Sequence, residues 1–151
     1  MPRSSTPRKP YRPRAINAPI TAGLMREFKD CFMTVETGLH LRIPTAEHFD
    51  ALALLLNTIG PVAIRRLGEQ HEDAQAIAVA AAAMNAGGER ALAAGGLAPL
   101  TDVELAAISR GIDAAKAAVP LLDVRSLAEQ HRAVRRRIAR EQTDNRIKEP
   151  A

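Results

Sequence analysis

Apolar residues recur every three to four positions along most of this chain, and very few of them are aromatic. Such spacing places apolar side chains on one face of an α-helix. Aromatic residues make up only 3% of the sequence, whereas β-sheets are rich in aromatic side chains. The pattern therefore predicts an all-α fold, a compact bundle of four to five short helices, and 151 residues suit one domain with tails.

The first nineteen residues differ from the rest because they combine frequent prolines with basic residues and lack apolar periodicity. Proline disfavours a helix, and a segment that buries little apolar surface cannot offset its ordering entropy. We expect residues 1–19 to form a flexible, disordered basic N-terminal arm, residues 20–142 the helical domain, and residues 143–151 a frayed C-terminal tail.

Two helices are expected in the first half of the domain. The first runs from about Thr21 to Glu36 and ends before Gly38, a plausible residue just beyond a helix C-terminus. The second is capped by Thr45 and runs over about 46–59, where Gly60-Pro61 is expected to break or kink it. A short helical piece over 62–67 follows.

The sequence predicts three more helices in the second half of the domain. The third begins near Glu72 and reaches at least Asn85, and Gly87-Gly88 either ends it or lets it resume until Gly95-Gly96. The fourth starts at Thr101-Asp102-Val103-Glu104, a capping box, and ends before Pro120. The fifth begins at Asp123 as N-cap and runs to about Gln142.

Charge is concentrated at the two ends of the chain. Residues 1–14 contain five bases and no acid, residues 15–122 eight bases and twelve acids, and residues 123–151 eight bases and five acids. The bases of the arm are Arg3, Arg8, Lys9, Arg12 and Arg14. Cationic segments flanking an acidic body most often meet a polyanion such as nucleic acid.

The last helix carries both a cationic face and an apolar stripe. Arginines that lie together away from the stripe are Arg125, Arg132, Arg136 and Arg140. The stripe has a three-four spacing, a short heptad pattern, and consists of Val124, Leu127, His131, Val134 and Ile138. We expect the arginines to contact phosphates and the stripe to be an interface, with His131 packed in it. A homodimer through this helix is a possible partner arrangement.

Each basic segment also has a simpler interpretation. The arm could follow a phosphate backbone or a DNA minor groove, and the alternatives are a solubilising terminus or a handle for a protein. The arginines could form only a solvated face. A helix-turn-helix made of the fourth and fifth helices is a weaker alternative, because Arg125, Ser126 and Gln130 are its few candidate recognition residues.

The sequence contains no pattern typical of catalysis or metal binding. His40, His48 and His71 lack metal-ligand spacing, and the single cysteine, Cys31, lies on an apolar helix face as expected for a buried, inert thiol. The glycine pairs follow no strand and so are interpreted as helix terminators. We therefore expect no enzyme, no catalytic residue, no metal and no cofactor.

The Lys-Pro-Tyr-Arg-Pro-Arg segment at residues 9–14, ahead of Ala-rich helices, looks like the organisation of small accessory proteins of phages and mobile elements. No functional residue is carried over from this resemblance. Our leading hypothesis is a small, non-enzymatic nucleic-acid-associated protein. The alternative is an adaptor, inhibitor or structural subunit that docks on an acidic protein surface. We expect a cytoplasmic location and no membrane partner, because the apolar runs are short.

Overall fold

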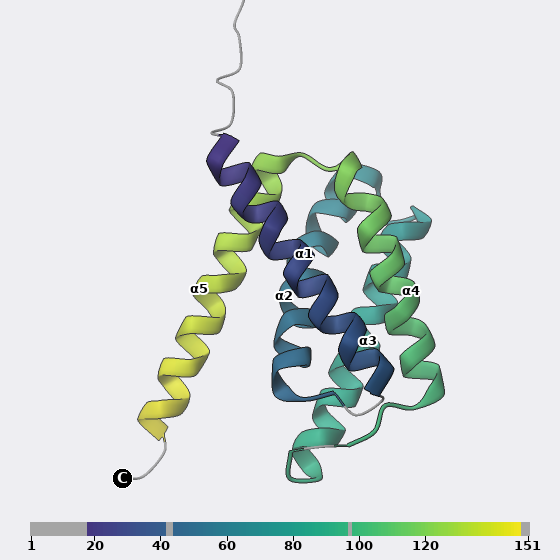
Figure 1. The fold of residues 1–151 in the computed structure, drawn as a ribbon, viewed down its shortest axis with the longest axis vertical. Helices are drawn as coiled ribbons and strands as arrows, with labels where there is room; N and C mark the ends of the chain where they lie inside the picture. The colour runs from purple at the N-terminus through teal and green to yellow at the C-terminus, as the bar shows by residue number, and fades with distance from the viewer. Residues whose placement is uncertain (1–17, 42–43, 97, 149–151) are drawn as a thin grey trace, which may run out of the picture.

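A computed structural model describes residues 18–41, 44–96 and 98–148 of the chain, and these residues form five α-helices and one short 3-10 helix. The elements are α1 (Ala18–Leu41), α2 (Ala46–Leu67), α3 (Glu72–Ala93), α4 (Asp102–Ala118), η1 (Val119–Leu121) and α5 (Val124–Lys148). The all-α prediction is confirmed (Figure 1). The basic residues of the arm lie outside the described residues, and α1 begins at Ala18, slightly before the expected boundary.

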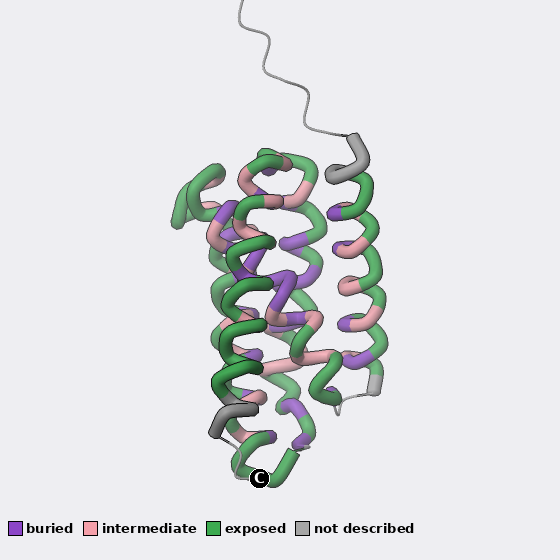
Figure 2. Tube along the Cα trace, turned by 90° about the vertical axis from the view of Figure 1, so that its left-hand side faces the viewer, coloured by how far each residue is buried: buried purple, intermediate pink, exposed green. Residues whose placement is uncertain are grey.

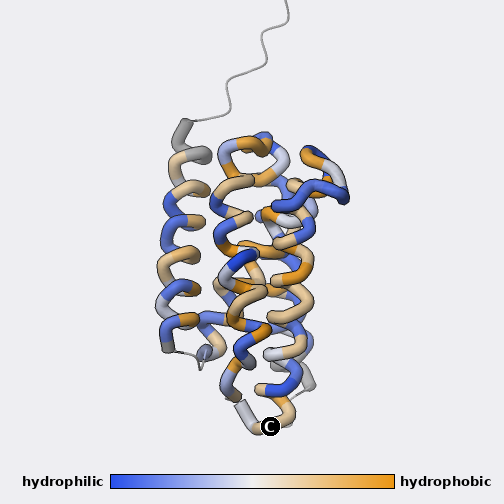
Figure 3. The backbone as a smooth tube through the Cα atoms, turned by 90° about the vertical axis from the view of Figure 1, so that its right-hand side faces the viewer, coloured by the Kyte–Doolittle hydropathy of each residue, from blue (hydrophilic) through white to orange (hydrophobic). Residues whose placement is uncertain are grey.

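The core is centred on α2, which packs against α1, α3 and α5. Leu55 and Ile59 of α2 are fully buried, as are Ile108 of α4 and Leu127 of α5. Figure 3 views the bundle from the side of α3 and α4 and shows hydrophobic and hydrophilic residues alternating along the helices, as amphipathic helices require. The apolar faces that the sequence periodicity predicts thus pack together into a single core.

The first helix is longer than expected, because Gly38 does not terminate it. Gly38 is buried inside α1, and a Cβ placed on it would lie 2.6 Å from Cγ of His48. The glycine therefore allows close approach of the α2 N-terminus rather than a change of chain direction. At that N-terminus, the backbone N–H of Thr45 donates to Nδ1 of His48 at 3.0 Å.

The expected break at Gly60-Pro61 is also wrong, since α2 continues through both residues to Leu67. A proline inside a helix removes the N–H that normally bonds to the carbonyl four residues earlier. Here that carbonyl belongs to Asn57, and Nε2 of Gln130 donates to it at 3.1 Å. A side chain of α5 thus replaces the hydrogen bond that Pro61 cannot make.

Of the two glycine pairs, only the second ends a helix. Gly87-Gly88 lies within α3, where a Cβ on Gly87 would come within 2.6 Å of Leu100. Gly95 and Gly96 follow α3 with φ of 86° and 134°, values that favour glycine. Close packing explains Gly87, and the chain reversal explains the second pair.

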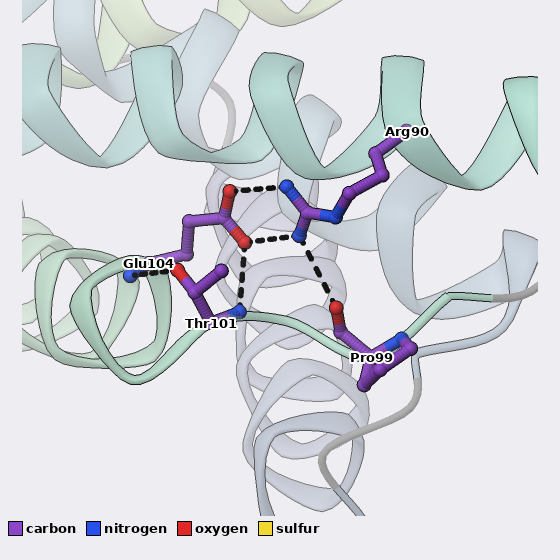
Figure 4. Close-up of polar contacts among 4 residues, drawn as sticks. All are labelled: Arg90, Pro99, Thr101 and Glu104. Carbon is purple, nitrogen blue, oxygen red and sulfur yellow. Dashed lines mark hydrogen bonds and ion pairs between the residues drawn. The ribbon is translucent and has the colours of Figure 1, made fainter.

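The capping box predicted for α4 is present and is part of a larger clasp. The amide of Glu104 donates to Oγ1 of Thr101 at 3.2 Å, and the amide of Thr101 donates to Oε2 of Glu104 at 2.9 Å. Arg90 of α3 donates to both carboxylate oxygens of Glu104, at 2.7 and 2.5 Å, and to the carbonyl of Pro99 at 3.2 Å (Figure 4). This clasp fixes the loop between α3 and α4.

Candidate nucleic-acid interface

The start of α5 is fixed by the residue expected to cap it. Oδ2 of Asp123 accepts hydrogen bonds from the backbone N–H and the hydroxyl of Ser126, both at 2.9 Å. These bonds lower the pKa of the Asp123 carboxyl. The helix then continues to Lys148, so part of the segment expected to be a frayed tail is helical.

The apolar stripe of α5 packs on the same chain. Leu127 and Val134 are 0% and 3% exposed, while Val124, His131 and Ile138 are partly buried. The main neighbour of α5 is α2. Because Leu127 and Val134 are buried within one molecule, these two side chains are not accessible to a second copy of the chain. The homodimer through the last helix is not tested by the structure and stays a prediction.

His131 is held between an aromatic ring and a carboxylate of α1. Its ring meets Phe28 edge to face with centroids 6.2 Å apart, and its Nε2 lies 3.0 Å from Oε2 of Glu27. Burial lowers the pKa of His131. The same Glu27 carboxylate is paired with the guanidinium of Arg135. The three side chains attach α5 to α1.

The four arginines of α5 that were predicted to bind phosphate are all exposed, and three of them lack an acidic partner among the described residues. Arg132, Arg136 and Arg140 form no ion pair with a carboxylate of the described residues. By contrast, Nε of Arg125 lies 3.1 Å from Oε1 of Glu129. The outer face of α5, which is towards the viewer in Figure 2, is exposed along nearly all its length.

The positions of Arg132, Arg136 and Arg140 follow from helix geometry. Residues four apart lie on one side of an α-helix, and a rise of about 1.5 Å per residue separates neighbouring arginines by roughly 6 Å. Leu127 and Val134 point into the bundle, so this cationic row lies on the opposite, solvent side. We call Arg132, Arg136 and Arg140 the outer arginine row.

The inner side of α5 faces acidic side chains of α1 and α2. A cleft of about 650 Å³ lies between α5 and the pair α1 and α2. Its acidic lining residues are Glu27, Asp30, Glu47 and Asp50, and its basic one is Arg135. A polyanion is repelled from this cleft and attracted to the outer arginine row, so the electric field of the protein favours approach from outside.

The structure gives Gln130 of α5 a different role from the one expected from the sequence. It was a candidate recognition residue of a helix-turn-helix, but it bonds to the Asn57 carbonyl freed by Pro61. In addition, α4 and α5 scarcely touch, so they do not form the packed pair of a helix-turn-helix. The sequence feature that could have indicated this role is Pro61 inside α2, because an internal proline leaves a backbone carbonyl without its usual hydrogen-bond donor.

The remaining candidates for chemistry have local roles. Nδ1 of His71 accepts from the amide of Asp73 at the start of α3, at 3.2 Å. Burial, and next the carboxylate of Asp30, raise the pKa of the half-buried Cys31 thiol. Among the described residues, no group of three histidine, cysteine or acidic side chains is placed to hold a metal ion.

Comparison of the chain with protein-family models, with curated proteins and with solved structures found no match. Within the described part of the chain, no helix is long and apolar enough to cross a membrane.

Proposed function

We propose that this chain is a small, non-enzymatic nucleic-acid-associated protein that binds the phosphate backbone through the outer arginine row of α5 and through its basic arm. The observation that supports this function best is the outer arginine row itself. Its three guanidinium groups are exposed, share one face of a helix and have no acidic partner among the described residues. Guanidinium groups bind phosphate through charge and paired hydrogen bonds.

Local charge adds to this support. Between residues 132 and 140 the chain contains five arginines and no acid. Arg135 is bound to Glu27, and Arg137 lies 4.0 Å from Glu141, so the net positive charge of the segment is carried mainly by the outer row. Such a cationic strip binds nucleic acid without reading its sequence, because the contacts are made with phosphates.

The arm supplies the second cationic element of the proposal. It carries five bases over fourteen residues without an acid. Since the body between the ends contains more acids than bases, the arm and α5 are the two regions to which a polyanion is attracted. Binding at both regions at once increases the overall affinity, as for any linked pair of binding modules.

Fluorescence anisotropy with a labelled DNA duplex at low and moderate salt tests the proposal. The full chain is compared with a chain lacking residues 1–14 and with the triple variant Arg132→Gln, Arg136→Gln, Arg140→Gln. We expect salt-sensitive binding that weakens in both variants, by at least about tenfold for the triple variant in low salt. No binding of the full chain in low salt contradicts the proposed function.

A matched control variant distinguishes the effect of the outer arginine row on DNA binding from the effect of net charge. The variant Arg65→Gln, Arg66→Gln, Arg110→Gln removes the same charge from exposed positions of α2 and α4. It is expected to bind DNA within about twofold of the wild-type affinity, because Arg65 and Arg66 belong to α2 and Arg110 to α4, outside the outer arginine row. Equal loss in both triple variants indicates that only net charge matters.

The second candidate function, an adaptor, inhibitor or structural subunit docking on an acidic protein surface, uses the same outer row. Charged rims steer such association, whereas buried apolar anchors provide most of its affinity. Protein docking without DNA binding favours this candidate. Replacing Ile138, a partly buried apolar residue that lines the cleft on the inner side of α5, then weakens the complex.

A further inference from the structure

The carboxyl half of α5 projects from the body of the protein. Residues 135–144 are exposed apart from the partly buried Ile138, and this half diverges from α2 in Figure 1. The amino half, by contrast, holds the buried Leu127 and Val134. One helix is therefore anchored at one end and open to solvent on its outer side at the other.

We propose that this projecting half inserts its outer side into the major groove of B-form duplex DNA, an inference that rests on the proposed function and names its substrate. An α-helix with side chains is about 10–12 Å across, and the B-form major groove is about 12 Å wide and 8.5 Å deep. The outer half of the helix thus fits the groove, while the acidic cleft on its inner side stays outside.

The arginines of this segment are distributed as a groove requires. Each residue advances about 100° around an α-helix. Arg135 and Arg137 therefore flank Arg136 on its two sides, and Arg132 and Arg140 lie above and below it. Arg136 faces the groove floor, while Arg132 and Arg140, each turned by about 40° from Arg136 and one turn away along the helix, face the two phosphate walls. Arg135 and Arg137 form ion pairs with Glu27 and Glu141.

Binding of single strands relies on a different feature, which this helix does not present. Proteins that hold single-stranded nucleic acid stack bases on aromatic side chains. Phe28 is buried, and Phe32 and Phe49 pack against the same core, so all three phenylalanines serve the helical body. The row of arginines along one helix face favours a duplex instead.

A comparison of two duplexes tests this inference. The A-form RNA duplex has a deep, narrow major groove that side chains cannot read, yet it carries similar phosphate charge. The full chain is titrated with a DNA duplex and an RNA duplex of equal length and corresponding sequence, at one salt concentration. We expect the DNA duplex to bind at least about tenfold more tightly, and guanine N7 atoms, which lie in the major groove, to be protected from methylation.

The outcomes distinguish this inference from the proposed function. Equal affinity for the two duplexes, or tighter binding of RNA, overturns major-groove insertion but leaves phosphate binding intact. Binding of neither duplex contradicts both. DNA binding without N7 protection also overturns insertion. As a matched pair, Arg136→Gln is expected to abolish N7 protection, and Arg125→Gln, near the anchored end, to preserve it; both positions are exposed, so both variants should fold.

Discussion

The α3–α4 pair and the α5 helix are attached to the same core in different ways. Between α3 and α4 the backbones approach so closely that a Cβ on Gly111 would lie 2.1 Å from Cβ of Ala80. The loop between them is fixed by the clasp of Arg90 and Glu104. By contrast, α5 is held by a narrow apolar stripe, by Gln130 and by Glu27.

This difference indicates that the α3–α4 pair stabilises the fold, whereas α5 presents charge on the surface. Small residues give α3 and α4 a close fit, which is suited to stability. The stripe of α5 buries few side chains, and the helix keeps its arginines exposed along the opposite face. A helix attached along one edge can present charge without disturbing the core. The following changes test that comparison.

The largest effect is expected from Leu127→Ala, which removes the fully buried anchor of α5. Deleting a buried leucine costs both transfer free energy and cavity free energy, so the free energy of unfolding should fall by about 3 kcal/mol. Urea denaturation measures this. The exposed Val103→Ala is the control, expected within about 0.5 kcal/mol of wild type. A loss below about 1 kcal/mol for Leu127→Ala contradicts the role of the stripe.

Gly111→Ala tests the α3–α4 pair. The added methyl group collides with Ala80 and lies 3.1 Å from the carbonyl of Ala76, so the helices must separate. We expect a loss of about 2 kcal/mol in unfolding free energy. Gly88, which has no neighbouring atom within 4 Å of a Cβ, is the matched control, and Gly88→Ala should stabilise by about 0.5–1 kcal/mol. The same sign for both variants would refute close packing at Gly111.

Glu104→Gln weakens the clasp, with an expected loss of about 1 kcal/mol because solvent screens the partly exposed Arg90. The hydrogen bond from Arg90 holds the pKa of Glu104 at about 2, below its ordinary 4.5. A lowered pKa means that the unfolded chain binds the proton more tightly. The contribution is therefore complete above pH 4.5 and disappears as the pH falls towards 2. Acid titration of unfolding free energy should show this loss, and Glu104→Gln should reduce it.

The smallest effect concerns the attachment of α5 through His131. Burial lowers its pKa below 6.5, so the unfolded chain again binds the proton more readily. Stability should thus rise with pH through the window just below 6.5, by less than about 1 kcal/mol. Chemical denaturation at several pH values detects the slope, which should disappear in His131→Gln. A stability that falls as pH rises through this window contradicts the lowered pKa.

Sequence periodicity was sufficient for the helices but not for their ends. The capping box at Thr101 and the N-cap at Asp123 were predictable because the participating residues are three apart. The continuations through Gly38 and Gly60-Pro61 were not, since they depend on partners distant in sequence, His48 and Gln130. Rules that consider only residues close together in the sequence cannot predict such tertiary contacts.

For the candidate site, the exposed arginines of α5 could be recognised from their spacing. What the sequence could not show is which of them are paired. Arg125 meets Glu129 on its own helix, whereas Arg135 meets Glu27, more than a hundred residues away in the chain. The acidic cleft behind α5 likewise combines residues of three helices. These contacts reduce the candidate phosphate contacts of α5 to the outer arginine row.

The most direct test of the central claim is the slope of log affinity against log salt concentration for a DNA duplex. Each phosphate contact contributes about 0.9 to that slope. If two or three arginines of the outer row contact phosphates, replacing all three by glutamine should make the slope shallower by about 1.8 to 2.7, while replacing Arg65, Arg66 and Arg110 should leave it unchanged. An unchanged slope in the first variant would contradict phosphate binding by the outer arginine row.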